Sequence, residues 1–189
     1  EDIAVLSSFQ NMRCYIPFCA EDTDAVVKSM MKYHGPSYLR LAKGSLPEKF
    51  TPVPYKPFRR IISGGKVTLV SYGPIALNVI EVIRKLSRDN IVDFFVVSEL
   101  PVMKINREFE GSLKKTRRLV IYEEHVSRGG LGENLALLLL KSRINIKIIH
   151  LHAKGYPRGL YGSQQYHLRV NGLDLHSLKK TILRLSSEK

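Results

Sequence analysis

Four continuous apolar runs rich in β-branched residues constrain the fold of this chain most strongly. The runs are KVTLVSY (66–72), VDFFVVS (92–98), RLVIYEE (118–124) and IKIIHLH (146–152). Strands that are apolar throughout, rather than alternating, are typical of parallel sheets covered by helices on both faces. Helical periodicity follows each run, and predicts helices over 75–86, 108–115, 131–142 and 173–185. We therefore predict an α/β fold with a three-layer, mostly parallel sheet.

The segment between residues 44 and 65, GSLPEKFTPVPYKPFRRIISGG, precedes this pattern. It holds four of the nine prolines and shows neither helical nor alternating apolar periodicity. Pro-rich connectors of this kind run extended over a surface between domains. We therefore predict a linker over 45–64, a first unit over 1–44 and a C-terminal domain over 65–189.

The sequence of residues 1–44 predicts a smaller unit, which consists of a short helix, a strand over 12–16, a helix over 22–34 and a strand over 37–41. Two parallel strands and one helix bury too little surface to fold alone, and both sheet edges would be unpaired. We therefore expect these residues to be the partial α/β end of a larger domain, with the remainder missing or supplied by another chain. The first residue, Glu1, fits a processed or excised piece.

Charge, hydropathy and cysteine content limit which kinds of partner and which cellular compartment we expect for this chain. Thirty Lys and Arg against seventeen Asp and Glu give a net charge of +13, which favours anionic partners. The longest aliphatic run, Leu135–Leu140, is far shorter than the ~20 apolar residues of a membrane helix, so we expect no membrane partner. Only Cys14 and Cys19 are present, and they predict reduced, buried thiols in the cytoplasm rather than a disulfide framework or zinc site.

The most distinctive string is EEHVSRGGLGE, residues 123–133, which runs from a strand into a helix. A glycine-rich turn there could point backbone N–H groups at an anion. The dinucleotide fingerprint is incomplete, however, because Leu135 stands in place of its third glycine. Alternation along the strand directs Glu124 and His125 to opposite faces, which disfavours a shared metal ion or an acid–base pair. We favour a tight crossover with polar capping.

Two further sets of residues favour structural roles. His150 and His152 share a strand face but lack a third ligand, so we expect hydrogen-bonded histidines rather than a metal site. The basic residues of 114–118 end a helix and lack interleaved aromatic residues, so a solvated surface is favoured over nucleic-acid binding.

Arg40 and Lys43, within YLRLAKG (38–44), are the candidate substrate-binding residues. They lie at the carboxyl end of a predicted parallel strand, which is where ligands of open α/β sheets gather. A cation there could contact a phosphorylated substrate. The alternative is that the two charges only mark the exit from the sheet, and the residues alone leave both interpretations open.

The order of several motifs resembles transketolase-like thiamine diphosphate enzymes. Residues 1–44 resemble the closing segment of their pyrimidine-binding domain, and residues 65–185 resemble their C-terminal domain. The matching steps are Glu1-Asp2-Ile3-Ala4, Gln10-Asn11-Met12, Ile16-Pro17, Ala20-Glu21-Asp22, Gly35-Pro36 to Arg40, Lys66 to Gly73, Glu124 to Gly132 and Asn171-Gly172-Leu173-Asp174. The resemblance covers nearly the whole chain.

The resemblance implies a cytoplasmic homodimer that transfers two-carbon units between sugar phosphates with thiamine diphosphate and Mg²⁺. The family's catalytic glutamate, Gly-Pro-Thr-His loop and Gly-Asp-Gly pattern lie outside the matched region. We therefore expect no catalytic, cofactor-binding or metal-binding residue in this chain, which alone would be inactive. The missing cofactor-binding domains would be partners in the same or another chain.

The resemblance also implies roles for the two candidate cations. Lys43 lies where the family places an arginine that contacts the sugar phosphate, and Arg40 matches a second arginine of the deoxyxylulose-phosphate synthases. A lysine supplies charge but not the planar bidentate fork of arginine, so the sugar specificity stays open.

Two alternatives remain. The chain could be the C-terminal region of a 2-oxo acid dehydrogenase β subunit, which would not need a phosphate-contacting cation at residue 43. It could instead be a non-catalytic basic module that binds an acidic partner or RNA, and RNA retention that falls steeply with salt would favour this possibility.

Overall fold

The computed structural model describes residues 1–51, 53–86, 90–156, 159 and 161–188. The elements in chain order are α1 (Asp2–Ser7), β1 (Arg13–Tyr15), η1 (Ala20–Asp22), α2 (Thr23–Met31), β2 (Ser37–Leu39), β3 (Phe58–Ile62), β4 (Val67–Tyr72), α3 (Ala76–Arg84), β5 (Val92–Val97), β6 (Glu99–Leu100), α4 (Arg107–Thr116), β7 (Arg118–Val126), α5 (Leu131–Ser142), β8 (Lys147–Ala153), α6 (Gln164–Val170) and α7 (Leu175–Ser187). None of these described helices is both long and apolar enough to cross a membrane.

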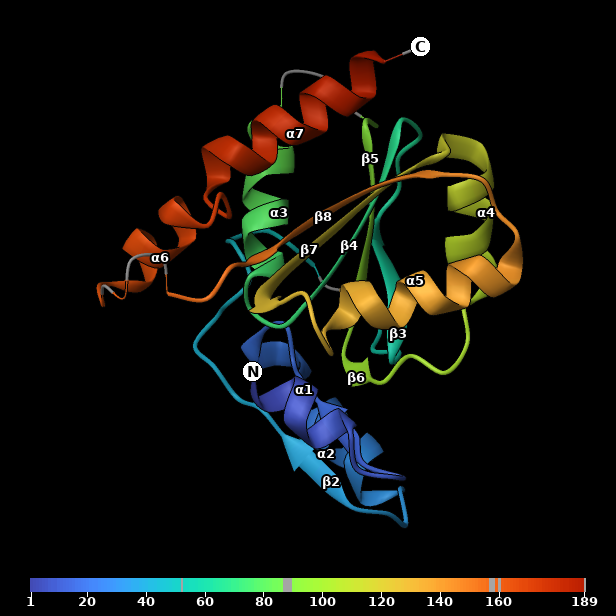
Figure 1. The fold of residues 1–189 in the computed structure, drawn as a ribbon, viewed down its shortest axis with the longest axis vertical. Coiled ribbons are helices and arrows are strands. Elements are labelled where there is room, and N and C mark those ends of the chain that lie inside the picture. Colours follow the sequence, from blue (N-terminus) through green and yellow to red (C-terminus); the bar gives the residue numbers. More distant parts are fainter. Residues whose placement is uncertain (52, 87–89, 157–158, 160, 189) are drawn as a thin grey trace.

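The larger sheet has five strands in the order β3-β5-β4-β7-β8 (Figure 1). Strands β5, β4, β7 and β8 are mutually parallel, and β3 pairs antiparallel with β5. All residues of β4 and β5 are buried, because helices cover both faces of the sheet centre. The α/β fold with a mostly parallel sheet is therefore confirmed.

Two apolar cores lie on the two faces of this sheet and make the structure three-layered. One core joins the sheet to α3 and α7 through residues such as Val79 and Ile182. The other joins it to α4 and α5 through residues such as Phe109 and Leu135. Figure 1 shows α3 and α7 on one side of the sheet and α4 and α5 on the other.

Residues 1–44, called the N-terminal segment below, pack against the carboxyl ends of the larger sheet (Figure 1). Their two strands form a second sheet in the order β2-β1-β6, in which β2 is parallel and β6 antiparallel to β1. The third strand thus comes from residues 99–100, directly after β5. Ile3 and Ile16 belong to the same core as α4 and α5, so the N-terminal segment is stabilised by contacts with the rest of the chain.

One strand lies inside the segment that we predicted as a linker. Residues 58–62 form β3, an edge strand of the larger sheet, so the last part of 45–64 is an integral part of that sheet. A charged residue in this strand, Arg59, is buried because it forms an ion pair. Nη2 of Arg59 lies 2.7 and 2.6 Å from the two carboxylate oxygens of Asp22, and both side chains are buried. This pairing lets a charged residue occupy an inward-facing strand position.

Candidate functional site

The strand order reverses direction between β4 and β7. From β4 the chain continues to β5 on one side, whereas β7 joins β4 on the other. Ligands of open α/β sheets bind at the carboxyl ends of strands at such a position. Here Ile16 of the N-terminal segment covers it, since a Cβ built on Gly73 would lie 3.1 Å from the Ile16 Cγ2. The remaining cavity, lined by Arg40, Tyr72 and Glu124 among others, measures about 20 Å³, which is room for about one water molecule.

Arg40 lines this small cavity directly after β2, and its guanidinium is already paired within the chain. Nη1 lies 3.3 Å from Oδ1 of Asp2, and the Tyr38 hydroxyl donates to the other Asp2 oxygen at 2.9 Å. Burial raises the pKa of Asp2, but the Tyr38 hydrogen bond and the Arg40 charge outweigh burial and hold it below its usual value. Arg40 therefore has a structural role in joining α1 to β2.

Lys43 lies three residues further along, and its side chain is exposed to solvent. Of the two candidate substrate-binding residues, only Arg40 lines the small cavity at the sheet edge. A phosphate contact by either residue remains a prediction.

The glycine-rich crossover is organised by Glu123, which is completely buried. Its carboxylate accepts hydrogen bonds from the backbone N–H groups of Leu131 and Gly132, both at 2.9 Å. These are the N–H groups at the start of α5 that an anionic ligand would otherwise use. The carboxylate thus caps the helix from inside the protein, which agrees with the capping role expected for this motif.

The glycines of this crossover are required by close approach. A Cβ on Gly130 would lie 2.5 Å from Oε2 of Glu123, and a Cβ on Gly132 would lie 2.3 Å from a ring carbon of His150. At Gly129, the backbone has φ of +69° and a Cβ would lie 2.5 Å from the Cβ of Ala4. The motif therefore holds a buried carboxylate and the N-terminal segment close to the backbone.

The two histidines of β8 form hydrogen bonds, as the sequence predicts. Nε2 of His150 lies 2.6 Å from Oε1 of Glu123, and Nδ1 of His152 lies 2.9 Å from the carbonyl oxygen of Ala153. Their ring centroids are 4.6 Å apart. Within the described residues, no three His, Cys, Asp or Glu side chains form a group that could hold a metal ion.

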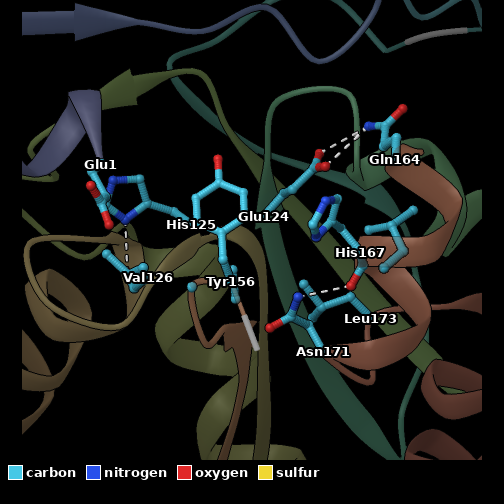
Figure 2. A pocket seen from close by; sticks show the side chains of 12 residues that line it. Glu1, Glu124, His125, Val126, Tyr156, Gln164, His167, Asn171 and Leu173 are labelled. Atoms are coloured by element: carbon cyan, nitrogen blue, oxygen red, sulfur yellow. Dashed lines mark hydrogen bonds between the residues drawn. The ribbon is translucent and has the colours of Figure 1, made fainter. Parts of the chain in front are cut away.

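A second cavity, of about 370 Å³, opens at the carboxyl ends of β7 and β8 and next to α6. We call it the β7–β8 pocket. Its polar lining includes Glu124, His125, Tyr156, Gln164, His167 and Asn171. Figure 2 shows the Glu124 carboxylate directed toward Gln164 and the His125 ring directed to the other side. Nε2 of Gln164 donates to the Glu124 carboxylate at 3.1 Å.

Glu124 and His125 thus line one cavity, although strand alternation predicted opposite faces. The pairing between β7 and β8 is irregular here, with a register shift between Tyr122 and Val126. Such irregularities change the direction of side chains relative to regular pleating. The two side chains still diverge in Figure 2, so the structure does not bring them onto one ion.

Sequence reasoning missed the side of the pocket formed by the segment after β8. None of the helices predicted from the sequence lies between residues 153 and 172, yet this segment contains α6 and contributes Gln164, His167 and Asn171. A local signal for α6 was present, because Ser163 directly precedes the helix and accepts the backbone N–H of Tyr166. Serine is a preferred residue at this capping position.

The basic cluster of 114–118 has structural partners. Nζ of Lys114 lies 2.6 Å from Oε1 of Glu110, and Lys115 donates to the carbonyl oxygen of Gly64 at 3.3 Å. Arg117 ends α4 with φ of +53°. These contacts agree with a solvated surface at a helix end.

Comparison with known proteins identifies a protein family that this chain matches. The family model described as "Transketolase, C-terminal domain" matches residues 58–165, more than half of the chain. The match starts at the first residue of β3.

Several curated proteins align with almost the whole chain. A 1-deoxy-D-xylulose-5-phosphate synthase of Clostridium perfringens is 24% identical over 97% of this chain and 30% of its own length. One subunit of an apulose-4-phosphate transketolase of Actinobacillus succinogenes is 25% identical over 98% of the chain and 61% of its own length. A putative transketolase C-terminal section of Methanocaldococcus jannaschii is 25% identical over 97% of the chain and 58% of its own length. The chain thus spans less than two thirds of each of these relatives.

Solved structures show the same fold. A split-gene transketolase, solved as an inactive β4 tetramer, superposes with a TM-score of 0.81 at 26% identity and covers 99% of this chain and 62% of its own. Transketolase from Leishmania mexicana gives a TM-score of 0.69 at 13% identity, over 98% of this chain and 27% of its own, which supports the fold alone. Because the family model matches more than half of the chain, this chain belongs to the transketolase family and is a transketolase-like C-terminal portion.

Proposed function

We propose that this chain is the C-terminal part of a thiamine diphosphate-dependent enzyme that transfers two-carbon units between sugar phosphates. The observation that carries the proposal is the extent of the alignments. Relatives named for a sugar-phosphate synthase and a sugar-phosphate transketolase align with 97% and 98% of the chain. The N-terminal segment is therefore included, and not only the part matched by the family model.

Neither of the two cavities at the carboxyl edge of the larger sheet fits the cofactor. The cavity at the strand-order reversal measures about 20 Å³, far below the ~300–1,000 Å³ of ordinary ligand pockets. The β7–β8 pocket has carboxylates and, among its described lining residues, no Lys or Arg, which disfavours a diphosphate. Both observations support a cofactor held by other domains.

Those domains would be partners. The chain covers 61% and 62% of two relatives, of which one is named as a single subunit of a transketolase and the other as a split-gene transketolase. We propose that further domains, on the same or another polypeptide, complete the cofactor site, and that the complete enzyme is a homodimer of such assemblies. A cytoplasmic location fits the two free, buried thiols, and burial raises the pKa of Cys19 to about 12, which keeps it protonated.

Within the complete enzyme, we propose that Lys43 contacts a substrate phosphate, with Arg40 beside it. Lys43 is exposed and can move to a ligand without breaking a buried contact. Arg40 would first have to give up or share its contact with Asp2. Lys43 is therefore the more sensitive residue to test.

The first test separates the chain from the complete enzyme by calorimetry. The isolated chain should give no binding heat with thiamine diphosphate and Mg²⁺, whereas the assembly with its cofactor-binding domains should. Stoichiometric binding by the chain alone would disprove the proposed division of labour.

The second test uses the complete enzyme. Lys43→Ala should raise the KM for a phosphorylated sugar by about tenfold or more, as the loss of a charge-assisted hydrogen bond predicts. It should leave the KM for the unphosphorylated sugar unchanged. Lys49→Ala, at another exposed lysine close by in the sequence, is the matched control. Turnover of 2-oxo acids but not ketose phosphates would instead identify a 2-oxo acid dehydrogenase.

A further inference from the structure

Helix α5 carries more leucine than the core beneath it covers. Its sequence is LGENLALLLLKS, and the helix lies in an outer layer of the molecule (Figure 1). Leu131, Leu135 and Leu139 are buried against the larger sheet, at the four-residue spacing of one helix face. Leu137 and Leu140 lie on the opposite, outer face, where their exposed fractions are 57% and 78%. A surface helix is normally polar on that face, so the outer face of α5 has the composition of a contact surface.

The charges on the outer face are one of each sign, at opposite ends of the helix. Glu133 lies in the first turn and Lys141 in the last turn, and both are exposed. Glu133 accepts the backbone N–H of Gly129 with one carboxylate oxygen, and a carboxylate has further acceptor sites for a cation. The chain as a whole has a net charge of +13, whereas these two charges cancel. The outer face therefore favours an apolar partner surface with one charge of each sign over an acidic one.

The spacing of these residues makes the outer face complementary to itself. Glu133 and Lys141 are each four positions from Leu137, so they are separated by ~12 Å along the axis at ~1.5 Å per residue. If a two-fold axis at Leu137 relates two antiparallel α5 helices, Glu133 of each copy faces Lys141 of the other. Both Glu–Lys pairs then form together, at the two ends of the leucines. A two-fold contact requires this self-complementarity, and an antiparallel arrangement also aligns the two helix dipoles favourably.

A loop held against α5 borders the outer face. The side chain of Asn134 accepts the backbone N–H of Val102 at 2.7 Å and donates to the Val102 carbonyl oxygen at 3.3 Å. The next residue of this loop, Met103, is 75% exposed. Methionine side chains adapt to irregular apolar contacts. The leucines of α5 therefore have a further apolar side chain in a loop that is fixed to the same helix.

We propose that the outer face of α5 binds a second copy of this chain, through an antiparallel pair of α5 helices related by a two-fold axis. Leu137 and Leu140 of both copies form the apolar centre, and the two Glu133–Lys141 pairs lie at its ends. The inference rests on one part of the proposed function, the homodimer, and assigns a contact surface to it. It uses neither Arg40 nor Lys43.

The first experiment measures self-association of the chain by sedimentation velocity over a range of concentrations. A pair of single helices is a small interface, so we expect a reversible dimer with a dissociation constant of roughly 1–100 μM. Leu140→Glu places a carboxylate in the apolar centre and should raise this constant about tenfold or more. Leu183→Glu is the matched control, because Leu183 is an exposed leucine of α7, on the other side of the larger sheet. It should dimerise like the wild type.

The second experiment tests the antiparallel arrangement by charge reversal. Glu133→Lys and Lys141→Glu each place like charges at both ends of the contact, and each should raise the dissociation constant about tenfold. An equal mixture of the two variants should dimerise like the wild type, because the mixed dimer has opposite charges at both ends. A mixture of Glu133→Lys with Lys180→Glu, a reversal at an exposed lysine of α7, should not restore the dimer. Circular dichroism of each variant measures folding.

Three outcomes would overturn the inference. A wild-type chain that stays monomeric up to about 100 μM would show that the outer face of α5 does not bind a second copy. An unchanged dissociation constant in Leu140→Glu would place the dimer contact elsewhere and would leave the proposed homodimer standing. Failure of the mixed charge-reversal variants to restore the dimer would rule out the antiparallel arrangement. None of these results bears on two-carbon transfer, which the calorimetry and KM measurements test.

Discussion

Replacing Glu123 by glutamine tests the buried cap of α5. The carboxylate is fully buried and has three neighbours, the backbone N–H groups of Leu131 and Gly132, both at 2.9 Å, and Nε2 of His150 at 2.6 Å. A glutamine has the same shape but only one acceptor oxygen. Its NH₂ group would then face a backbone N–H group, and two donors would lie against each other.

The expected loss of stability follows from these contacts. A hydrogen bond to a charged group contributes about 1.5–3 kcal/mol, and a buried donor left without a partner costs about 1–3 kcal/mol. These terms are not additive in one cluster, so we expect Glu123→Gln to lose about 2–4 kcal/mol. For a chain of this length, about 2–4 °C per kcal/mol gives a fall in Tm of roughly 5–15 °C.

The assay is thermal and urea unfolding followed by circular dichroism. Glu124→Gln is the matched control, because Glu124 is its sequence neighbour but is only half-buried and accepts from one amide, that of Gln164. The control should change stability by less than about 0.5 kcal/mol. A Glu123→Gln protein that melts within about 2 °C of the wild type would show that the carboxylate does not hold the helix.

Three further predictions concern stability. Arg59→Ala should lose about 3–5 kcal/mol in urea unfolding, because it leaves the buried Asp22 carboxylate without its ion-pair partner. Gly132→Ala should lose about 1–3 kcal/mol through overpacking, since its Cβ would lie 2.3 Å from an imidazole carbon of His150. The control Gly111→Ala, whose Cβ would have nothing within 4 Å, should gain up to about 1 kcal/mol by helix propensity. Equal effects of the two substitutions in urea unfolding would contradict the packing argument. Asp174→Ala should lose about 1 kcal/mol, because Asp174 is the N-cap of α7. Burial raises the pKa of Asp174, but the hydrogen bonds that it accepts outweigh burial and lower it from 3.8. The difference in stability between Asp174→Ala and the wild type should therefore be largest at pH 7 and should shrink as the pH falls below 3.8 toward the lowered pKa of Asp174 in the folded protein. Thermal melts at about pH 7 and about pH 3 measure this difference. A difference that persists unchanged at the acidic pH would rule out the charged cap.

Strand β3 shows why part of the larger sheet escaped prediction. Its sequence, FRRII, carries two arginines, and a polar residue in an apolar strand face normally argues against a strand. Arg59 is buried because Asp22, 37 positions earlier in the sequence, pairs with it. A partner so distant leaves no local signal around residues 58–62. Strand β6 was missed for a similar reason, because its pairing with β1 joins residues that are far apart in the sequence.

In the candidate site, too, features that depend on local contacts could be predicted, and features that depend on distant contacts could not. The glycine-rich crossover and its capping role could be predicted, because Glu123 and the start of α5 are eight and nine residues apart. The location of the pocket could not. It depends on Ile16 approaching Gly73, which closes the cavity between β4 and β7, and on α6 folding back beside β8.

The sequence by itself determined the alternation of strands and helices, the two-sided burial of the central strands and the local capping of helices. These features depend on the period of apolar residues and on contacts a few residues apart. Only the tertiary structure decided which carboxyl-edge cavity stays open, which charges are buried and which strands complete the two sheets. Those outcomes depend on packing between residues that are distant in the chain, and such contacts leave no periodic signal in the sequence.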